Sequence, residues 1–129
     1  METAADAKVV LVVDDEGQVL QLTSRMVQRL GYDVVGAKDG EEALACFANG
    51  EHPFCAALID LNLPGMSGEE TLKELRQKAP ELPALLASGY DESACVGRAE
   101  GPGPTAFIQK PYRIAALREA LQKLLDEER

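Results

Sequence analysis

The sequence predicts an α/β fold: a doubly wound parallel sheet of five strands with helices on both faces. Short apolar runs, the first of them rich in valine, alternate along the chain with longer segments whose apolar residues have helical spacing. Four of the five short runs end at polar residues, which marks the point where a buried strand leaves the sheet. Alternating strands and helices form parallel sheets, because right-handed crossovers place the helices on the faces.

The first half of the chain supplies two strands and two helices. The first strand is Val9–Val13, and three acidic residues follow it. The next segment is helical, and Gly31 is expected to end it. A second strand covers residues 32–35, and a second helix opens at residues 39–40 and closes at residues 49–50. The apolar residues expected to face the core from the two helices are Val19, Leu22, Met26, Val27 and Leu30, then Ala43, Leu44 and Phe47.

The middle of the chain supplies the third and fourth strands. The third is Phe54–Ile59, which ends at Asp60, and the fourth covers residues 82–87 and ends at Ser88. Between them Ser67 is a predicted helix N-cap, because a glutamate three residues later completes a capping box. That helix should bury Leu72 and Leu75 and stop at Pro80.

The last part of the chain is less regular. A weak helix is expected over residues 91–99, and the Gly-Pro-Gly-Pro segment at 101–104 must be a loop. A short fifth strand around Phe107 precedes Lys110. The final helix frays at residues 126–129, and its apolar face is Ile114, Leu117, Leu121, Leu124 and Leu125.

Length and charge limit the possible functions. The 129 residues suit one domain, which we assign to residues 8–126, with short tails at 1–7 and 127–129. The formal net charge is −9, from 22 acidic and 13 basic residues. Because an acidic protein repels nucleic-acid phosphates, we expect no direct binding to DNA or RNA.

The sequence also suggests where the protein is found. No apolar run approaches the roughly 20 residues that span a bilayer, and the N-terminus does not resemble a signal peptide, so we expect no membrane contact by this chain. The cysteines Cys46, Cys55 and Cys95 show no metal-ligand spacing, and we expect them to be reduced and mostly buried. These features favour a cytoplasmic protein.

Polar residues at four strand ends form the candidate site. Ligands of open parallel sheets bind outside the carboxyl ends of the strands. The residues at those ends are Asp14, Asp15, Asp60, Ser88 and Lys110. Singly, each has an ordinary explanation: an aspartate can be a turn former, the lysine a solvated surface residue, and the serine part of a turn. Their co-occurrence favours a common site.

These residue types indicate phosphoryl chemistry with a metal. Clustered carboxylates repel one another unless a cation neutralises them, and oxygen ligands without histidine or cysteine favour Mg²⁺, or Mn²⁺. An aspartate can attack phosphorus, while a metal, a lysine and a hydroxyl stabilise the charge on the transferred group. Asp60, Lys110, Ser88 and a metal held by Asp15 would provide these parts.

Four segments of the chain resemble motifs of response-regulator receiver domains of bacterial two-component signalling. They read LVVDDE at residues 11–16, LIDLNLPGMSG at 58–68, ASGY at 87–90 and FIQKPY at 107–112. The resemblance covers about residues 8 to 125, in the right order. It implies a chemotaxis-regulator-like fold with the flavodoxin-like strand order 2-1-3-4-5.

The resemblance also implies roles for single residues. Asp60 would accept a phosphoryl group from a phosphohistidine, and it would share the metal with Asp14, Asp15 and the backbone carbonyl of Asn62. Lys110 would pair with the phosphoryl oxygens.

A second group of implied roles concerns the response to phosphorylation. Ser88 would hydrogen-bond the phosphoryl group, and Phe107 would move inward as the switch aromatic. The Lys110–Pro111 peptide bond is expected to be cis. We hypothesise that the bulky Tyr90 shields the phosphoryl group from water and slows its loss.

The implied partner is a histidine kinase or a histidine phosphotransfer domain, and the oligomeric state is left open. The motifs at residues 87–90 and 107–112 look like those of receivers attached to hybrid sensor histidine kinases. The chain is therefore either a stand-alone regulator or, as we favour, a piece of such a kinase, whose parent protein could be membrane-associated.

Two other functions are open to this sequence. One is a phosphatase similar to haloacid dehalogenases, with Asp14 as the nucleophile and Glu16 in place of the usual second acid. The other is an interaction module that keeps the fold without the chemistry. No glycine-rich phosphate loop is present, so ATP is not the expected direct donor, and we expect an acceptor of its own phosphoryl group rather than a turnover enzyme.

Overall fold

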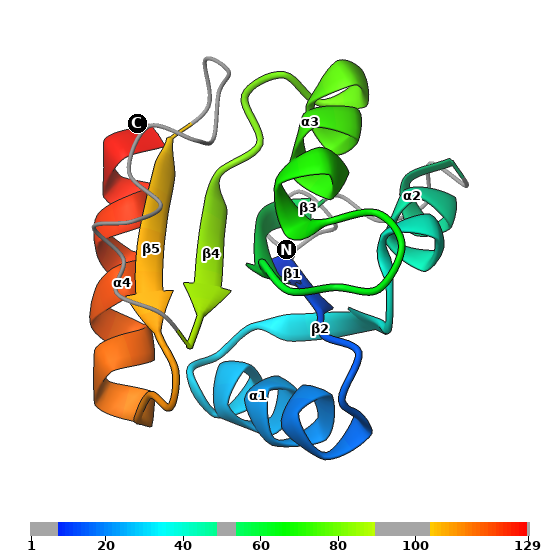
Figure 1. The fold of residues 1–129 in the computed structure, drawn as a ribbon. Helices are drawn as coiled ribbons and strands as arrows, with labels where there is room; N and C mark the ends of the chain where they lie inside the picture. Colours follow the sequence, from blue (N-terminus) through cyan, green and yellow to red (C-terminus); the bar gives the residue numbers. More distant parts are fainter. Residues whose placement is uncertain (1–7, 49–53, 90–103, 129) are drawn as a thin grey trace.

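The predicted parallel sheet is present. A computed structural model of the protein describes residues 8–48, 54–89 and 104–128, which form five parallel strands in the order β2-β1-β3-β4-β5 with helices on both faces (Figure 1). The strands are β1 (Val9–Val13), β2 (Asp33–Ala37), β3 (Phe54–Asp60), β4 (Ala84–Ser88) and β5 (Thr105–Gln109). The helices are α1 (Gly17–Arg29), α2 (Gly40–Ala48), α3 (Gly68–Lys78) and α4 (Ile114–Glu128).

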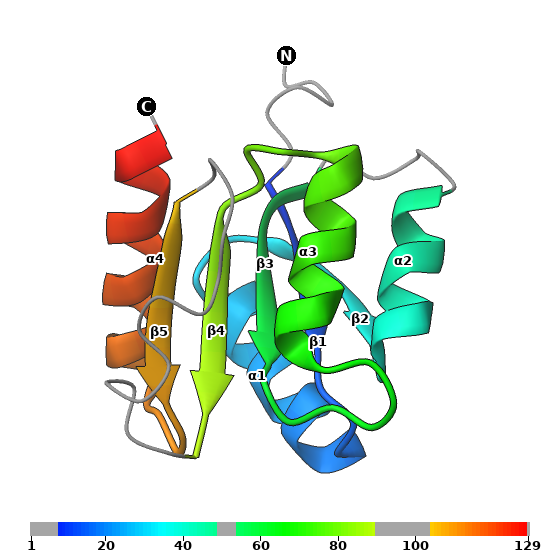
Figure 2. The same ribbon diagram turned by 45° about the horizontal axis from the view of Figure 1, so that its top comes forward.

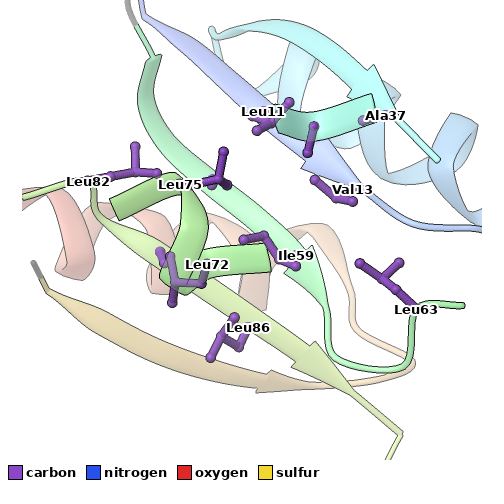
Figure 3. Close-up of a cluster of buried hydrophobic side chains, with 12 residues drawn as sticks. Leu11, Val13, Ala37, Ile59, Leu63, Leu72, Leu75, Leu82 and Leu86 are labelled. Atoms are coloured by element: carbon purple, nitrogen blue, oxygen red, sulfur yellow. The ribbon is translucent and has the colours of Figure 1, made fainter. Parts of the chain in front are cut away.

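The sheet separates two hydrophobic layers, and its strands contribute to them alternately. Leu11 and Val13 of β1 enter the layer under α2 and α3, whereas Val10 and Val12 enter the layer under α1 and α4. Figure 2 shows the two pairs of helices on opposite faces. In the first layer, side chains of α3 such as Leu72 meet those of β3 and β4 (Figure 3). This alternation follows from the two-residue period of a strand.

Burial differs between the central and the edge strands. Every residue of β1 and β4 is buried, as are the last five residues of β3. The edge strands β2 and β5 each have a single buried residue. A parallel strand between two neighbours has both faces covered, which explains the uninterrupted valine run of β1.

Two predicted helix ends are confirmed. Gly31 follows α1 with a φ of 103°, a conformation that favours glycine, and its N–H donates to the carbonyl of Gln28. Ser67 caps α3 in a complete capping box: its Oγ accepts from the Glu70 amide at 3.1 Å, and the Glu70 carboxylate accepts from the Ser67 amide at 3.0 Å. The capping box of Ser67 and Glu70 fixes the start of α3 close to the end of β3.

Strand bounds differ from the prediction in two places. The second strand covers residues 33–37 instead of 32–35, because it pairs with β1 over its whole length, from Val9↔Asp33 to Val13↔Ala37. The fourth strand begins at Ala84 instead of Leu82, because Pro83 has no N–H for the ladder and the Leu82 carbonyl accepts hydrogen bonds from a side chain.

Some predicted side-chain positions were also wrong. Leu22 was expected in the core, but it is 58% exposed, because Thr23 and Val27, four residues apart, occupy the buried line of α1. Cys46 and Cys55 are half-buried rather than mostly buried. The helix expected at residues 91–99, Tyr90 and Cys95 lie outside the described residues. None of the helices that the structure describes combines the length and the apolar composition that crossing a bilayer demands.

Candidate functional site

The candidate site residues come from neighbouring strands at one edge of the sheet. Asp14 directly follows β1, Asp60 ends β3, Ser88 ends β4, and Lys110 directly follows β5. The pairing aligns these ends, because Asp60 lies opposite Ala87 and Ser88 lies opposite Gln109. Residues as far as 96 positions apart in the sequence are thereby gathered at the carboxyl edge of the sheet, where the sequence analysis expected them.

Three carboxylates converge at this edge. One oxygen of each of Asp14, Asp15 and Asp60 lies within 4.8 Å of the others. Asp14 and Asp60 are buried, with exposed fractions of 4% and 6%, whereas Asp15 faces solvent. Three carboxylate oxygens at this spacing, one of them open to water, fit a hard divalent cation that keeps part of its hydration shell.

Backbone amides orient the two buried carboxylates. Oδ1 of Asp14 accepts from the Glu16 amide at 3.0 Å, and Oδ1 of Asp60 accepts from the Asn62 amide at 3.1 Å. In both residues the other oxygen, Oδ2, faces Lys110. The chain that leaves each strand therefore fixes the direction of its own acid.

Lys110 reaches both buried acids. Its Nζ lies 2.9 Å from Oδ2 of Asp14 and 3.2 Å from Oδ2 of Asp60. One ammonium against three carboxylates leaves this group of four side chains with a formal charge of −2. A divalent cation would balance that charge.

The pKa values of the site reflect burial and these contacts. Burial raises the pKa of Asp60, and the Asn62 amide and Lys110 only partly offset this, while the charge of Asp14 adds to it. For Lys110, burial acts to lower the pKa, but the hydrogen bond to Asp14 and the attraction of both acids outweigh it and raise the pKa. Lys110 is therefore a cation at neutral pH.

The remaining predicted residues surround this group. Ser88 is buried at the end of β4, and its carbonyl accepts from the Lys110 amide at 2.7 Å. Phe107 of β5 lies opposite Leu86 of β4 and packs against the layer under α2 and α3. Because side chains alternate along a strand, Ser88 and Leu86 point to the same face, so Ser88 and Phe107 share it. The Lys110–Pro111 peptide bond is cis, as expected.

Two contacts at the site were not predicted from the sequence. Thr23 of α1 and Tyr112 share a hydrogen bond of 3.0 Å between their hydroxyl groups. Gly68, the first residue of α3, lies so close to the end of β3 that a Cβ there would come within 2.4 Å of the Asp60 carbonyl oxygen. A threonine on the apolar line of a helix was the signal for the first contact, and nothing in the sequence pattern signalled the second.

An apolar groove adjoins the site. It has a volume of about 290 Å³ and lies between α1 and the segment that follows β5. Leu22 contributes to its wall and is the large hydrophobic side chain that stands exposed among the described residues. Lys110 also lines it, so the groove and the carboxylate cluster share one residue. The residues lining it are Glu16, Val19, Leu22, Thr23, Met26, Lys110, Pro111 and Tyr112.

Comparison with known proteins agrees with this geometry. The family model described as response regulator receiver domain matches residues 10–122. The alkaline phosphatase synthesis transcriptional regulatory protein PhoP of Bacillus subtilis is 44% identical over 105 residues, which are 81% of this chain and 43% of that protein. The sensor kinase CckA of Brucella abortus is 29% identical over 92% of this chain and 13% of that protein. The chain thus spans less than half the length of these two curated relatives.

A solved structure extends the similarity to three dimensions. The CheY-like response regulator receiver domain protein of Methanospirillum hungatei superposes with a TM-score of 0.81 at 30% identity. The match covers 95% of this chain and 97% of that one. The five-stranded order and the positions of the helices are therefore those of a known fold.

Proposed function

Because the chain belongs to the family of response regulator receiver domains, we propose that it accepts a phosphoryl group on Asp60 from a phosphohistidine. The observation that carries this proposal is the contact of Lys110 with both buried acids, which puts a fixed cation beside the acceptor carboxylate. A lysine pointing away from Asp60 would have argued against any transfer chemistry at this edge. The chain acts as an acceptor and not as a turnover enzyme.

In the proposed transfer, an Asp60 carboxylate oxygen attacks phosphorus. The new O–P bond forms as the N–P bond of the phosphohistidine breaks, and the electron pair returns to the imidazole of the donor, which takes up a proton. Negative charge is present on the phosphoryl oxygens throughout, and the ammonium of Lys110, which contacts Asp60, would stabilise it.

The residues at the site fit Mg²⁺ or Mn²⁺. Asp14, Asp15, Asp60 and the backbone carbonyl of Asn62 would hold the ion, as oxygen ligands of a hard cation. When bound, the ion would neutralise charge on the carboxylates and on the phosphoryl oxygens. The formal charge of −2 left by Lys110 and the three acids supports a divalent rather than a monovalent cation.

We further propose that phosphorylation switches the conformation through Ser88 and Phe107. The hydroxyl of Ser88 would move to hydrogen-bond a phosphoryl oxygen. The space that this hydroxyl leaves would then admit the ring of Phe107. The shared face of these two residues and the low burial of β5 support this. Because Phe107 has no hydroxyl, the signal would depend on packing alone.

The proposed phosphodonor is a histidine kinase or a histidine phosphotransfer domain in the cytoplasm. A protein donor must bring its histidine to Asp60 and must therefore cover the surface beside it. The groove that contains the exposed Leu22 shares Lys110 with the site, so it is the apolar surface that such a donor would bury. The similarity to a sensor kinase supports a parent protein of the hybrid kinase type.

Labelling with acetyl phosphate and Mg²⁺ tests the function directly. We expect mass spectrometry to find a single labile phosphoryl adduct on the wild type and none on Asp60→Asn. A phosphatase related to the haloacid dehalogenases would instead lose labelling only in Asp14→Asn. Complete absence of labelling would leave the chain as a phosphate-independent interaction module.

A further inference from the structure

Two side-chain interactions join the chain that follows β5 to the chain that follows β1. The ion pair of Lys110 with Asp14 connects the chain after β5 to the chain after β1. The 3.0 Å hydrogen bond of Tyr112 with Thr23 lies two residues further along the chain after β5 and nine residues further along the chain after β1, within α1. Together with the intervening backbone, these links close a ring that contains both Lys110 and Asp14.

The backbone of Lys110 is anchored on one side by the sheet. Its N–H donates to the carbonyl of Ser88 at 2.7 Å, which extends the β4–β5 pairing. On its other side a single residue, Pro111, separates Lys110 from Tyr112, and the proline ring restricts φ there. Movement of Tyr112 is therefore transmitted to Lys110 through a short and stiff connection.

The second link is largely shielded from water. Thr23 has an exposed fraction of 2%, and Tyr112 packs against the hydrophobic layer under α1 and α4. Loss of either hydroxyl would leave the other without this partner in a mostly apolar setting. The link thus favours one position of Tyr112.

We propose that Tyr112 is a positioning residue for Lys110, and that its bond to Thr23 holds the lysine between Asp14 and Asp60. A lysine side chain is long and flexible, so the direction of its ammonium depends on where its backbone is held. Holding the amine in place before the phosphoryl group arrives lowers the barrier to transfer. This inference rests on the proposed acceptor function of Asp60.

The test measures the rate of labelling by acetyl phosphate at saturating Mg²⁺. Tyr112→Phe and Thr23→Val each remove the hydrogen bond, and each should slow labelling about fivefold, the change expected for one lost hydrogen bond. Thr23→Ser keeps a hydroxyl and should retain the wild-type rate. Tyr32→Phe, which removes a phenol hydroxyl where β2 begins at the opposite edge of the sheet, is the matched control.

A second background separates positioning from a general loss of structure. In Lys110→Ala, which itself should label slowly, adding Tyr112→Phe should have almost no further effect, because the residue that it positions is gone. An equal slowing in both backgrounds, or wild-type labelling by Tyr112→Phe or by Lys110→Ala, overturns the inference. If Tyr112→Phe does not fold, Thr23→Val decides on the same criteria.

The experiment also distinguishes failure of this inference from failure of the proposed acceptor function of Asp60. A wild type that takes no label refutes the acceptor function and the inference together. A wild type whose labelling depends on Asp60 and Lys110 but not on Tyr112 or Thr23 refutes the inference alone.

Discussion

The ammonium of Lys110 lies 3.2 Å from the carboxylate of Asp60, between two buried acids that would otherwise repel each other. The contact stabilises the folded protein. It partly offsets the free energy required to bury two aspartates side by side.

Replacing Lys110 with methionine should therefore destabilise the protein. Lys110→Met keeps the apolar part of the side chain but leaves two buried carboxylates without their cation, and we expect the free energy of unfolding to fall by about 1–3 kcal/mol at neutral pH without divalent ions. Urea denaturation measures this. Lys73→Met, at an exposed position of α3, is the control, with a change within about 0.5 kcal/mol. Equal stability of both variants would contradict the prediction.

Removing the charge of Asp60, as in Asp60→Asn, should stabilise the protein at neutral pH. Because burial raises its pKa in the folded state, the folded protein binds this proton more tightly than the unfolded chain. The corresponding stability is present at pH values below the ordinary value of 3.8 and is lost as the pH rises through the raised pKa. Asp60→Asn avoids that loss.

The difference in melting temperature between Asp60→Asn and the wild type should therefore grow as the pH rises from about 3.8 towards neutrality, in metal-free buffer. Thermal melts at a series of pH values with a chelator present measure it. Asp33→Asn, at an exposed position of β2, provides the comparison. A difference that stays constant or shrinks with rising pH would contradict the raised pKa of Asp60 in the folded protein.

Mg²⁺ should stabilise the wild type by binding to the acids. A ligand of the folded state at a hundred times its dissociation constant adds about 2.7 kcal/mol to the free energy of unfolding. Asp15→Asn should weaken this effect without disturbing the buried pair, because Asp15 faces solvent. Melting curves with Mg²⁺ and after addition of a chelator measure it, and Asp39→Asn, near the start of α2, is the control. An unchanged wild-type melt, or full stabilisation of Asp15→Asn, would argue against this ligand set.

Gly68 should tolerate no side chain. In Gly68→Ala the new Cβ would come within 2.4 Å of the Asp60 carbonyl oxygen, so the backbone of β3 or α3 must shift, at about 1–3 kcal/mol of stability. Labelling at Asp60 should slow as well, since the carboxylate belongs to the displaced residue. Gly17→Ala is the matched control, because a Cβ there meets nothing within 4 Å, and it should be neutral or stabilising. Wild-type stability of Gly68→Ala would show that α3 is free to move.

Leu22 should affect phosphoryl transfer from a protein donor and not from a small molecule such as acetyl phosphate. Leu22→Asp puts a charge on an exposed position, so we expect stability to stay within about 0.5 kcal/mol of the wild type. Transfer from a phosphorylated histidine phosphotransfer domain should slow about tenfold, through about 1.4 kcal/mol of lost contact, while labelling by acetyl phosphate is unchanged. Leu22→Met preserves the apolar contact and is the control. Equal slowing with both donors would place the defect in the site rather than in docking.

The sequence was sufficient to predict the fold and the members of the site. Uninterrupted apolar runs such as Val9–Val13 identify buried parallel strands, and the residues that follow such runs must lie at one edge of the sheet. The order of the strands and the roles of Asp60 and Lys110 came from the resemblance to a family. Their convergence is confirmed by the geometry, whereas their roles await the experiments above.

The features that the sequence did not predict depend on how the helices are oriented against the sheet. Helical spacing gives the apolar stripe of α1 but not its centre, so Leu22 was assigned to the core where Thr23 lies. The bond of Thr23 to Tyr112 links residues 89 positions apart, and no local pattern encodes it. The close approach of Gly68 to Asp60 likewise depends on the path of the loop between them.

The central strands and the edge strand β5 differ in how much apolar surface their displacement would expose. Asp14 and Asp60 extend from strands covered on both faces, whose displacement would bring much apolar surface into water. Phe107 belongs to β5 at the margin of the sheet, which can be displaced with far less exposure of apolar surface. A shift of β5 would therefore alter the edge of the sheet while the central strands, which carry the two buried acids, keep their apolar faces covered.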